Sequence, residues 1–119
     1  MAGSSDTTGD LCAVHKVQGT EIYNAALEKL GHLQDLMFDK VSGRVVYAIL
    51  SIGGFFGFGE RHYPLPWEKL KYNAELDGYI VDVPHHLLEG APSYAAEAHW
   101  QDAAWVERIR AYYAGPELT

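Results

Sequence analysis

The stretch of residues 42–67 constrains the fold of this chain more than any other part of its sequence. It begins with Ser42-Gly43, a pair that predicts a hairpin turn, and continues with Arg44–Ser51, where nearly every residue is apolar or β-branched. Such a run is typical of a strand that is buried on both faces, as the wall of a small barrel requires. The next predicted strand, Arg61–Leu65, has one proline within it and another just after it, and proline has no N–H to donate to a ladder. We therefore expect Arg61–Leu65 at a sheet edge or at the seam of a barrel.

Alternating apolar residues between turn signals predict further short strands. Asp77-Gly78 is a strong hairpin signal between residues 72–76 and 79–83. In His32–Asp39 the alternation breaks, and a bulge near Gln34-Asp35 would restore it. The remaining predictions are strands at Cys12–Val17 and Thr20–Tyr23 and a turn over residues 24–29. The residues expected to be buried together as the core are Leu36, Phe38, Val46, Ala48, Leu50, Leu65, Trp67 and Ile80.

The C-terminal part of the sequence changes from strand to helix periodicity. A proline and a glycine bound a short helical segment, His85–Glu89. Over residues 95–114 the apolar side chains recur at helical spacing, as at Trp105, Ile109 and Tyr112, and predict an amphipathic helix. The predicted fold class is therefore all-β, a small β-barrel with a C-terminal amphipathic helix. Its expected divisions are a disordered tail at residues 1–10, the barrel domain at 11–94, and the helix with its tail at 95–119.

Composition and charge argue against several classes of protein. With 119 residues, of which 48% are hydrophobic, the chain suits one domain with one core. A net charge of −7 and scattered Lys and Arg residues argue against nucleic acid or an anionic membrane as a partner. No apolar run approaches the ~20 residues that cross a bilayer, so we expect no membrane insertion. The polar start is unlike a signal peptide, and the single Cys12 forms no internal disulfide, so a cytoplasmic location is expected.

Residues that could bind nucleotide or metal do not form the required patterns. The glycine-rich connection 53–59 lacks the third spaced glycine of a phosphate-binding loop, and prolines follow where the helix should begin. The adjacent His85 and His86 diverge by about 100° on a helix, and the other histidines complete no ligand set. We therefore predict no cofactor and no metal-binding residues.

Candidate catalytic residues are equally few. Asp35 and Asp39 would lie roughly 13 Å apart along a strand, which is too far for an acid–base pair. Asp39 is instead expected to accept hydrogen bonds from backbone amides of the turn that follows it. A nucleophilic pair of Cys12 and His15 lacks a third group to orient it. No catalytic residue is therefore predicted.

Two clusters rich in aromatic residues are the candidate partner-binding residues. They are Phe55, Phe56 and Phe58 in the glycine-rich connection, and Trp105, Ile109, Tyr112 and Tyr113 on the C-terminal helix. The phenylalanines could plug the end of the barrel or form an exposed patch, and the helix could dock on its own barrel or on a second subunit. Because one small barrel hides fewer large apolar side chains than this, we expect a homodimer with the helix at the interface.

The order of motifs along the chain resembles the PRC-barrel family. The resemblance rests on Leu30–Asp39, Ser42–Ala48, Gly53-Gly54-Phe55, Gly57-Phe58-Gly59, Pro66-Trp67, Leu70-Lys71-Tyr72 and Gly78-Tyr79, and it covers residues 14–94. This family takes its name from the cytoplasmic domain of the photosynthetic reaction centre H subunit, and a related barrel forms the C-terminal half of a ribosome maturation factor. The resemblance implies a small β-barrel that serves as a binding or adaptor module without catalysis of its own.

Three functions are compatible with this sequence. The first is a free-standing, non-catalytic PRC-barrel module that acts through protein–protein contact with an unidentified partner. The second is an enzyme that depends on a small molecule or a metal and has its site at the barrel mouth. The third is a ribosome-associated factor, which the net charge of −7 disfavours.

Overall fold

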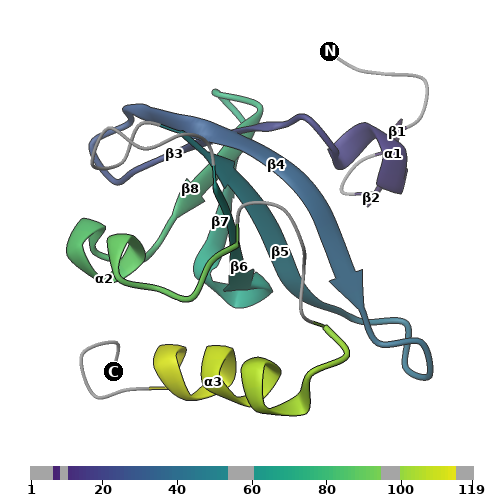
Figure 1. The fold of residues 1–119 in the computed structure, drawn as a ribbon. Coiled ribbons are helices and arrows are strands. Elements are labelled where there is room, and N and C mark those ends of the chain that lie inside the picture. Colours follow the sequence, from purple (N-terminus) through teal and green to yellow (C-terminus); the bar gives the residue numbers. More distant parts are fainter. Residues whose placement is uncertain (1–6, 9–10, 54–60, 95–99, 115–119) are drawn as a thin grey trace.

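The computed structural model describes residues 7–8, 11–53, 61–94 and 100–114, and its main element is a curled six-stranded sheet (Figure 1). The strand order is β6-β5-β4-β3-β8-β7, and the sheet forms a half-barrel. The strands are β3 (Glu21–Tyr23), β4 (Lys29–Phe38), β5 (Val45–Ile52), β6 (Arg61–Pro66), β7 (Leu70–Asn73) and β8 (Gly78–Val81). A separate pair comprises β1 (Thr7–Thr8) and β2 (Leu11–Cys12). The helical elements are α1 (Val14–Val17), η2 (Trp67–Lys69), α2 (His85–Glu89) and α3 (Ala103–Tyr113).

All neighbouring strands of the large sheet are antiparallel except β3 and β8, which run parallel. The predicted all-β class and C-terminal helix are thus confirmed. Within the described residues, no helix is both long enough and apolar enough to cross a membrane.

The long β4–β5 hairpin contains the predicted bulge and the predicted turn. The register shifts between Leu33 and Asp35, which confirms the bulge at Gln34. In the turn, Gly43 has a φ of 80°, a conformation that suits glycine because it has no Cβ. A second register shift, between Met37 and Phe38, lies at the end of β4 next to this turn.

The edge strand β6 has its outer side partly occupied. Pro64 and Pro66 pair with Ile49 and Tyr47 of β5, as the prediction of an edge position requires. On the side away from β5, His62 exchanges two backbone hydrogen bonds with Tyr94, at 2.8 and 3.0 Å. Tyr94 therefore lies alongside β6 at this edge of the sheet.

The core confirms part of the predicted set and corrects the rest. Ala48, Leu50 and Leu65 are fully buried, and Leu36, Trp67 and Ile80 are half-buried. Phe38 and Val46 were expected in the core, but they are 60% and 42% exposed. The prediction was wrong because no described element covers the ends of β4 and β5 next to the turn. The main core cluster also contains Ile22, Leu33, Ile52, Tyr63, Leu70, Val81, Leu88, Ala91, Trp105, Ile109 and Tyr113.

The first predicted strand, Cys12–Val17, is also wrong. β2 ends at Cys12, and residues 14–17 form the single helical turn α1, in which the amide of Lys16 donates to the carbonyl of Ala13. A β7–β8 hairpin is present as predicted, but its turn lies earlier in the sequence. The loop spans residues 74–77, Gly78 is the first residue of β8 rather than part of the turn, and β7 begins at Leu70.

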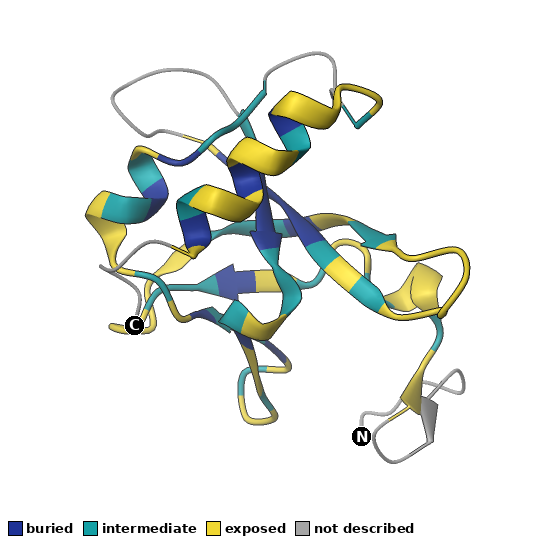
Figure 2. Cartoon of the chain, turned by 90° about the horizontal axis from the view of Figure 1, so that it is seen from below, coloured by how far each residue is buried: buried dark blue, intermediate teal, exposed yellow. Residues whose placement is uncertain are grey.

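Helix α3 begins later than predicted, at Ala103 rather than near residue 95. The carboxylate of Asp102 caps it by accepting hydrogen bonds from the amides of Ala104 and Trp105, at 3.0 and 3.3 Å. Buried positions recur along the helix between exposed ones (Figure 2). They are Trp105, Ile109 and Tyr113, which pack into the core of the same chain.

Candidate interaction surface

The free end of the β4–β5 hairpin exposes three large apolar side chains. Val41 in the turn is 97% exposed, and Phe38 and Val46 flank it on the two strands. The hairpin extends away from the rest of the sheet (Figure 1), and its loop is exposed along its length (Figure 2). The surface made by Phe38, Lys40, Val41, Arg44 and Val46 is called the hairpin tip below.

The turn fixes the charge of the hairpin tip. The carboxylate of Asp39 accepts hydrogen bonds from the amides of Ser42 and Val41, at 2.9 and 2.8 Å. These bonds favour the ionised carboxylate and so lower the pKa of Asp39 further below neutral pH. The side chains of Lys40 and Arg44 are exposed and form no ion pair with any described residue. The tip therefore presents cations beside apolar surface, on a chain whose net charge is −7.

A shallow hollow of about 200 Å³ lies between α2, the end of β8 and the turn that connects β3 to β4. Its polar lining residues are Asn24 and His85, and its apolar ones include Leu30, Val81 and Leu88. This space is called the α2 hollow below. Because most of its lining is apolar, an apolar group that enters it displaces water from apolar surface.

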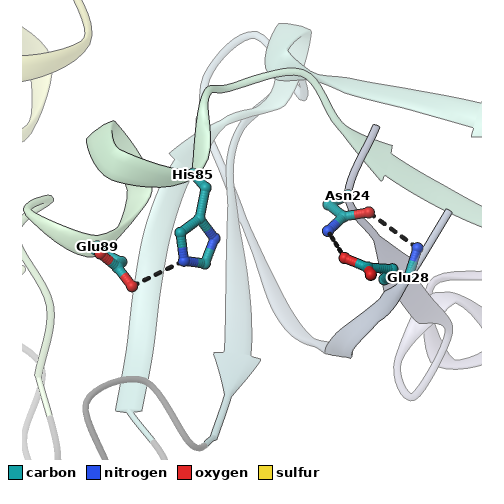
Figure 3. A network of polar contacts seen from close by, with 4 residues as sticks. All are labelled: Asn24, Glu28, His85 and Glu89. Carbon is teal, nitrogen blue, oxygen red and sulfur yellow. Dashed lines mark hydrogen bonds and ion pairs between the residues drawn. The ribbon is translucent and has the colours of Figure 1, made fainter. Parts of the chain in front are cut away.

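Each polar lining residue of the α2 hollow is bound to a carboxylate (Figure 3). Asn24 donates its amide to Glu28 at 2.8 Å, and its carbonyl accepts from the amides of Ala26 and Glu28 at 2.9 Å each. His85 Nε2 lies 2.8 Å from Glu89 Oε2 across one turn of α2. Neither carboxylate lines the α2 hollow, but Glu28 lies next to Asn24 on the turn side and Glu89 next to His85 on the α2 side.

The predicted partner-binding residues of α3 lie mostly inside the fold. Trp105, Ile109 and Tyr113 are 5%, 0% and 6% exposed. Tyr112 is half-buried, and its hydroxyl donates to the carbonyl of Leu87, which joins α3 to α2. Of the two alternatives for this helix, the structure shows docking on its own barrel. Phe55, Phe56 and Phe58 lie outside the described residues.

The buried end of α3 contains an unsatisfied polar group. The hydroxyl of Tyr113 is buried and has no hydrogen-bond partner among the described residues. Burial raises the pKa of Tyr113, and the neighbouring Tyr112, Tyr63 and Tyr47 contribute less. The phenol is therefore neutral throughout the physiological range.

A series of contacts between aromatic rings connects the sheet to α3. The centroids of Tyr47 and Trp100 are 5.7 Å apart, and those of Trp100 and Trp105 are 5.3 Å apart. The series of ring contacts continues from Trp105 to Tyr94 and from Tyr94 to His62, with ring-centroid separations of 6.0 and 5.2 Å. These tilted and edge-on contacts stabilise the docked position of α3.

The other candidate residues from the sequence are dispersed. Among the described residues, no three His, Cys, Asp or Glu side chains lie close enough to hold a metal ion. Asp35 accepts a hydrogen bond from the amide of Leu36, whereas Asp39 caps the turn as predicted. Cys12 is exposed, and its thiol lies 3.5 Å from the carbonyl of Ala13.

Sequence reasoning missed the hairpin tip because it assigned Phe38 and Val46 to the core. The available signal was the polar composition of residues 39–44, in which Val41 is the one large apolar residue. Such a composition indicates a long exposed turn, and the strand ends next to a long turn are less often covered.

The comparisons with known proteins gave one result. A family model described as PRC-barrel domain matches residues 10–88, about two thirds of the chain. The matched region includes the whole curled sheet and most of α2, and it ends before α3. The search of curated proteins found no match.

Proposed function

The chain belongs to the PRC-barrel family, and on this premise we propose that it is a binding module that acts through protein–protein contact. The module has no reaction of its own, and the hairpin tip is its contact surface. The observation that carries the proposal is the exposure of Phe38, Val41 and Val46 together on one projecting hairpin.

Exposed apolar side chains at the tip provide energy for association. Complete burial of a Phe or Val side chain is worth about 1.5–3 kcal/mol, so covering the tip offsets part of the entropy lost on binding. Aromatic and Arg side chains are also the commonest anchors of protein interfaces, and the tip contains Phe38 and Arg44.

Charge supports a protein as the partner rather than nucleic acid. Phosphate backbones bind surfaces on which many Lys and Arg side chains cluster, whereas the tip has only Lys40 and Arg44. The remainder of the chain is acidic and would repel a polyanion. A small apolar surface with two cations instead suits an apolar site that has acidic groups around it.

The test is a quantitative capture experiment with matched variants. Immobilised wild-type chain and the Phe38→Ser/Val41→Ser variant are exposed to the same lysate, and bound proteins are measured by mass spectrometry. The matched control is Leu11→Ser/Val14→Ser, which removes side chains that are 72% and 66% exposed elsewhere. We expect the tip variant to lose ~90% of specifically bound protein, because each lost anchor costs 1 kcal/mol or more.

The control variant should retain its partners, and circular dichroism should show that both variants keep the fold of the wild type. Equal capture by all three proteins, or a loss in the control variant alone, would contradict the proposed role of the tip.

A further inference from the structure

The hairpin tip and the α2 hollow lie at opposite ends of the molecule. The tip follows the C-terminal end of β4, whereas the turn that forms one wall of the hollow precedes the N-terminal end of the same strand (Figure 1). The ten residues of β4 make nine steps of about 3.3 Å, so the two ends are separated by roughly 30 Å along the strand. The tip of one chain therefore cannot enter the hollow of the same chain.

The α2 hollow has the shape and lining of a site for an apolar side chain. Its volume of about 200 Å³ corresponds to roughly seven water molecules at ~30 Å³ each. Leu30, Val81 and Leu88 contribute apolar surface to it, so this water has few hydrogen-bonding partners in the lining. An entering Val or Phe side chain would release the water into the bulk.

The surroundings of the hollow favour an apolar group that is accompanied by cations. Glu28 lies on the turn side and Glu89 on the α2 side (Figure 3). Each uses one carboxylate oxygen in the interaction shown, and a carboxylate accepts several hydrogen bonds. A cation on either side of an inserted apolar group would therefore meet a carboxylate.

The hairpin tip has this combination of groups. Val41 is the most exposed of the large apolar side chains that the structure describes, and the exposed Phe38 lies three residues before it. Lys40 and Arg44 flank Val41, and Asp39, the one carboxylate of the turn, is occupied by backbone amides. The tip thus complements the α2 hollow in both polarity and charge.

We propose that the hairpin tip of one chain docks in the α2 hollow of a second copy of the same chain. This rests on the proposed function in so far as the tip is the contact surface. Val41 and Phe38 enter the hollow, and Lys40 and Arg44 approach the carboxylates of Glu28 and Glu89. The self-contact differs from the dimer expected from the sequence, because α3 takes no part in it.

The separate positions of the two surfaces determine the possible assemblies. A contact between two different surfaces either closes into a ring, including a reciprocal pair with two contacts, or continues as an open chain. In each case every contact contains one tip and one hollow. Changing either surface in all copies therefore removes all contacts, and complementary changes in two variants restore them.

Charge reversal tests this by sedimentation equilibrium at physiological salt, with the intact chain at up to ~100 µM, a range suited to weak contacts. One variant is Lys40→Glu/Arg44→Glu, and the other is Glu28→Lys/Glu89→Lys. We expect the wild type to self-associate and each variant alone to associate at least ~10-fold more weakly, because like charges then meet at each contact. An equimolar mixture of the two variants should regain association, because each tip then meets a hollow of opposite charge.

Two controls separate these contacts from an effect of net charge. Lys71→Glu/Arg108→Glu changes the net charge as the tip variant does, at exposed positions outside the tip. Glu68→Lys/Glu75→Lys does the same for the hollow variant. We expect both controls to self-associate as the wild type does, and circular dichroism should show an unchanged fold in all variants.

A wild type that is monomeric throughout this range, or a mixture that fails to recover, overturns the proposed self-contact. If capture of another protein still depends on Phe38 and Val41 in that case, the proposed function stands without the self-contact. If neither association nor capture depends on the tip, both proposals fail.

Discussion

Replacing Tyr113 by Phe should stabilise the protein, although Tyr113 is buried in the core. The ring packs in the core with 6% of the residue exposed, and its hydroxyl has no hydrogen-bond partner in the part of the chain that the structure describes. A buried polar group without a partner costs about 1–3 kcal/mol, because it gives up its bonds to water on folding. Phenylalanine keeps the ring contacts and leaves at most a space the size of one oxygen. We expect a gain of about 1 kcal/mol, which for a domain of this size raises Tm by roughly 4 °C.

The adjacent residue provides the matched control. Tyr112→Phe removes the same atom from the same helix, but its hydroxyl donates to the carbonyl of Leu87. That change should lower the free energy of unfolding by about 1 kcal/mol, because it removes this hydrogen bond and the Leu87 carbonyl loses a donor. Thermal and urea denaturation of the two variants should therefore shift in opposite directions. A Tyr113→Phe variant that is as destabilised as Tyr112→Phe would refute the reasoning.

Alkaline titration gives a second measurement on the Tyr113→Phe variant. Burial raises the pKa of Tyr113 in the folded chain, whereas the unfolded chain titrates near the ordinary value of ~10. A raised folded pKa means that the stability from this group is present below the unfolded pKa and is lost as pH rises above it. The wild type should therefore lose stability above pH ~10 more steeply than the variant, which has no phenol at this position. Parallel stability curves above that pH would contradict the burial of the hydroxyl.

Two further predictions test the sheet. Gly31→Ala should destabilise the protein by more than about 3 kcal/mol, since the new Cβ would lie 2.0 Å from the carbonyl oxygen of Ser51 on the neighbouring strand. Soluble yield and urea denaturation measure this, and a variant with wild-type stability would mean that β4 and β5 approach less closely. Leu50→Ala should cost about 2–5 kcal/mol because Leu50 is fully buried, whereas Val46→Ala should cost well under 1 kcal/mol. If urea denaturation showed equal losses of stability for the two variants, Val46 would have to be buried as Leu50 is.

Local chemistry made the hairpin and its bulge predictable from the sequence. Asp39 and Gly43 act within the turn that contains them, and the bulge at Gln34 follows from a broken alternation within one strand. The same holds for the edge position of β6, because a proline lacks its N–H wherever it lies. Such features depend on a few neighbouring residues, so they can be predicted without knowing where distant parts of the sequence lie in the fold.

The exposure of Phe38 and Val46 could not be predicted in the same way. An apolar residue in a strand is buried only where another element covers it, and that depends on how far β4 and β5 extend beyond their neighbours. The position at which α3 docks likewise depends on contacts between residues far apart in the sequence, such as the bridge between His62 and Tyr94. The hairpin tip was therefore visible only in three dimensions.

The occupied edge of β6 bears on how the protein behaves at high concentration. Open strand edges let sheets of separate molecules join into insoluble aggregates, which grow by adding one strand after another. Pro64 and Pro66 offer no N–H to such a strand, and His62 already exchanges both of its outward bonds with Tyr94. A mutation that releases residue 94 from this position, while α3 stays folded, should therefore shorten the time before turbidity appears in a concentrated sample. The bridge thus protects this edge of the sheet from pairing with a strand of another molecule.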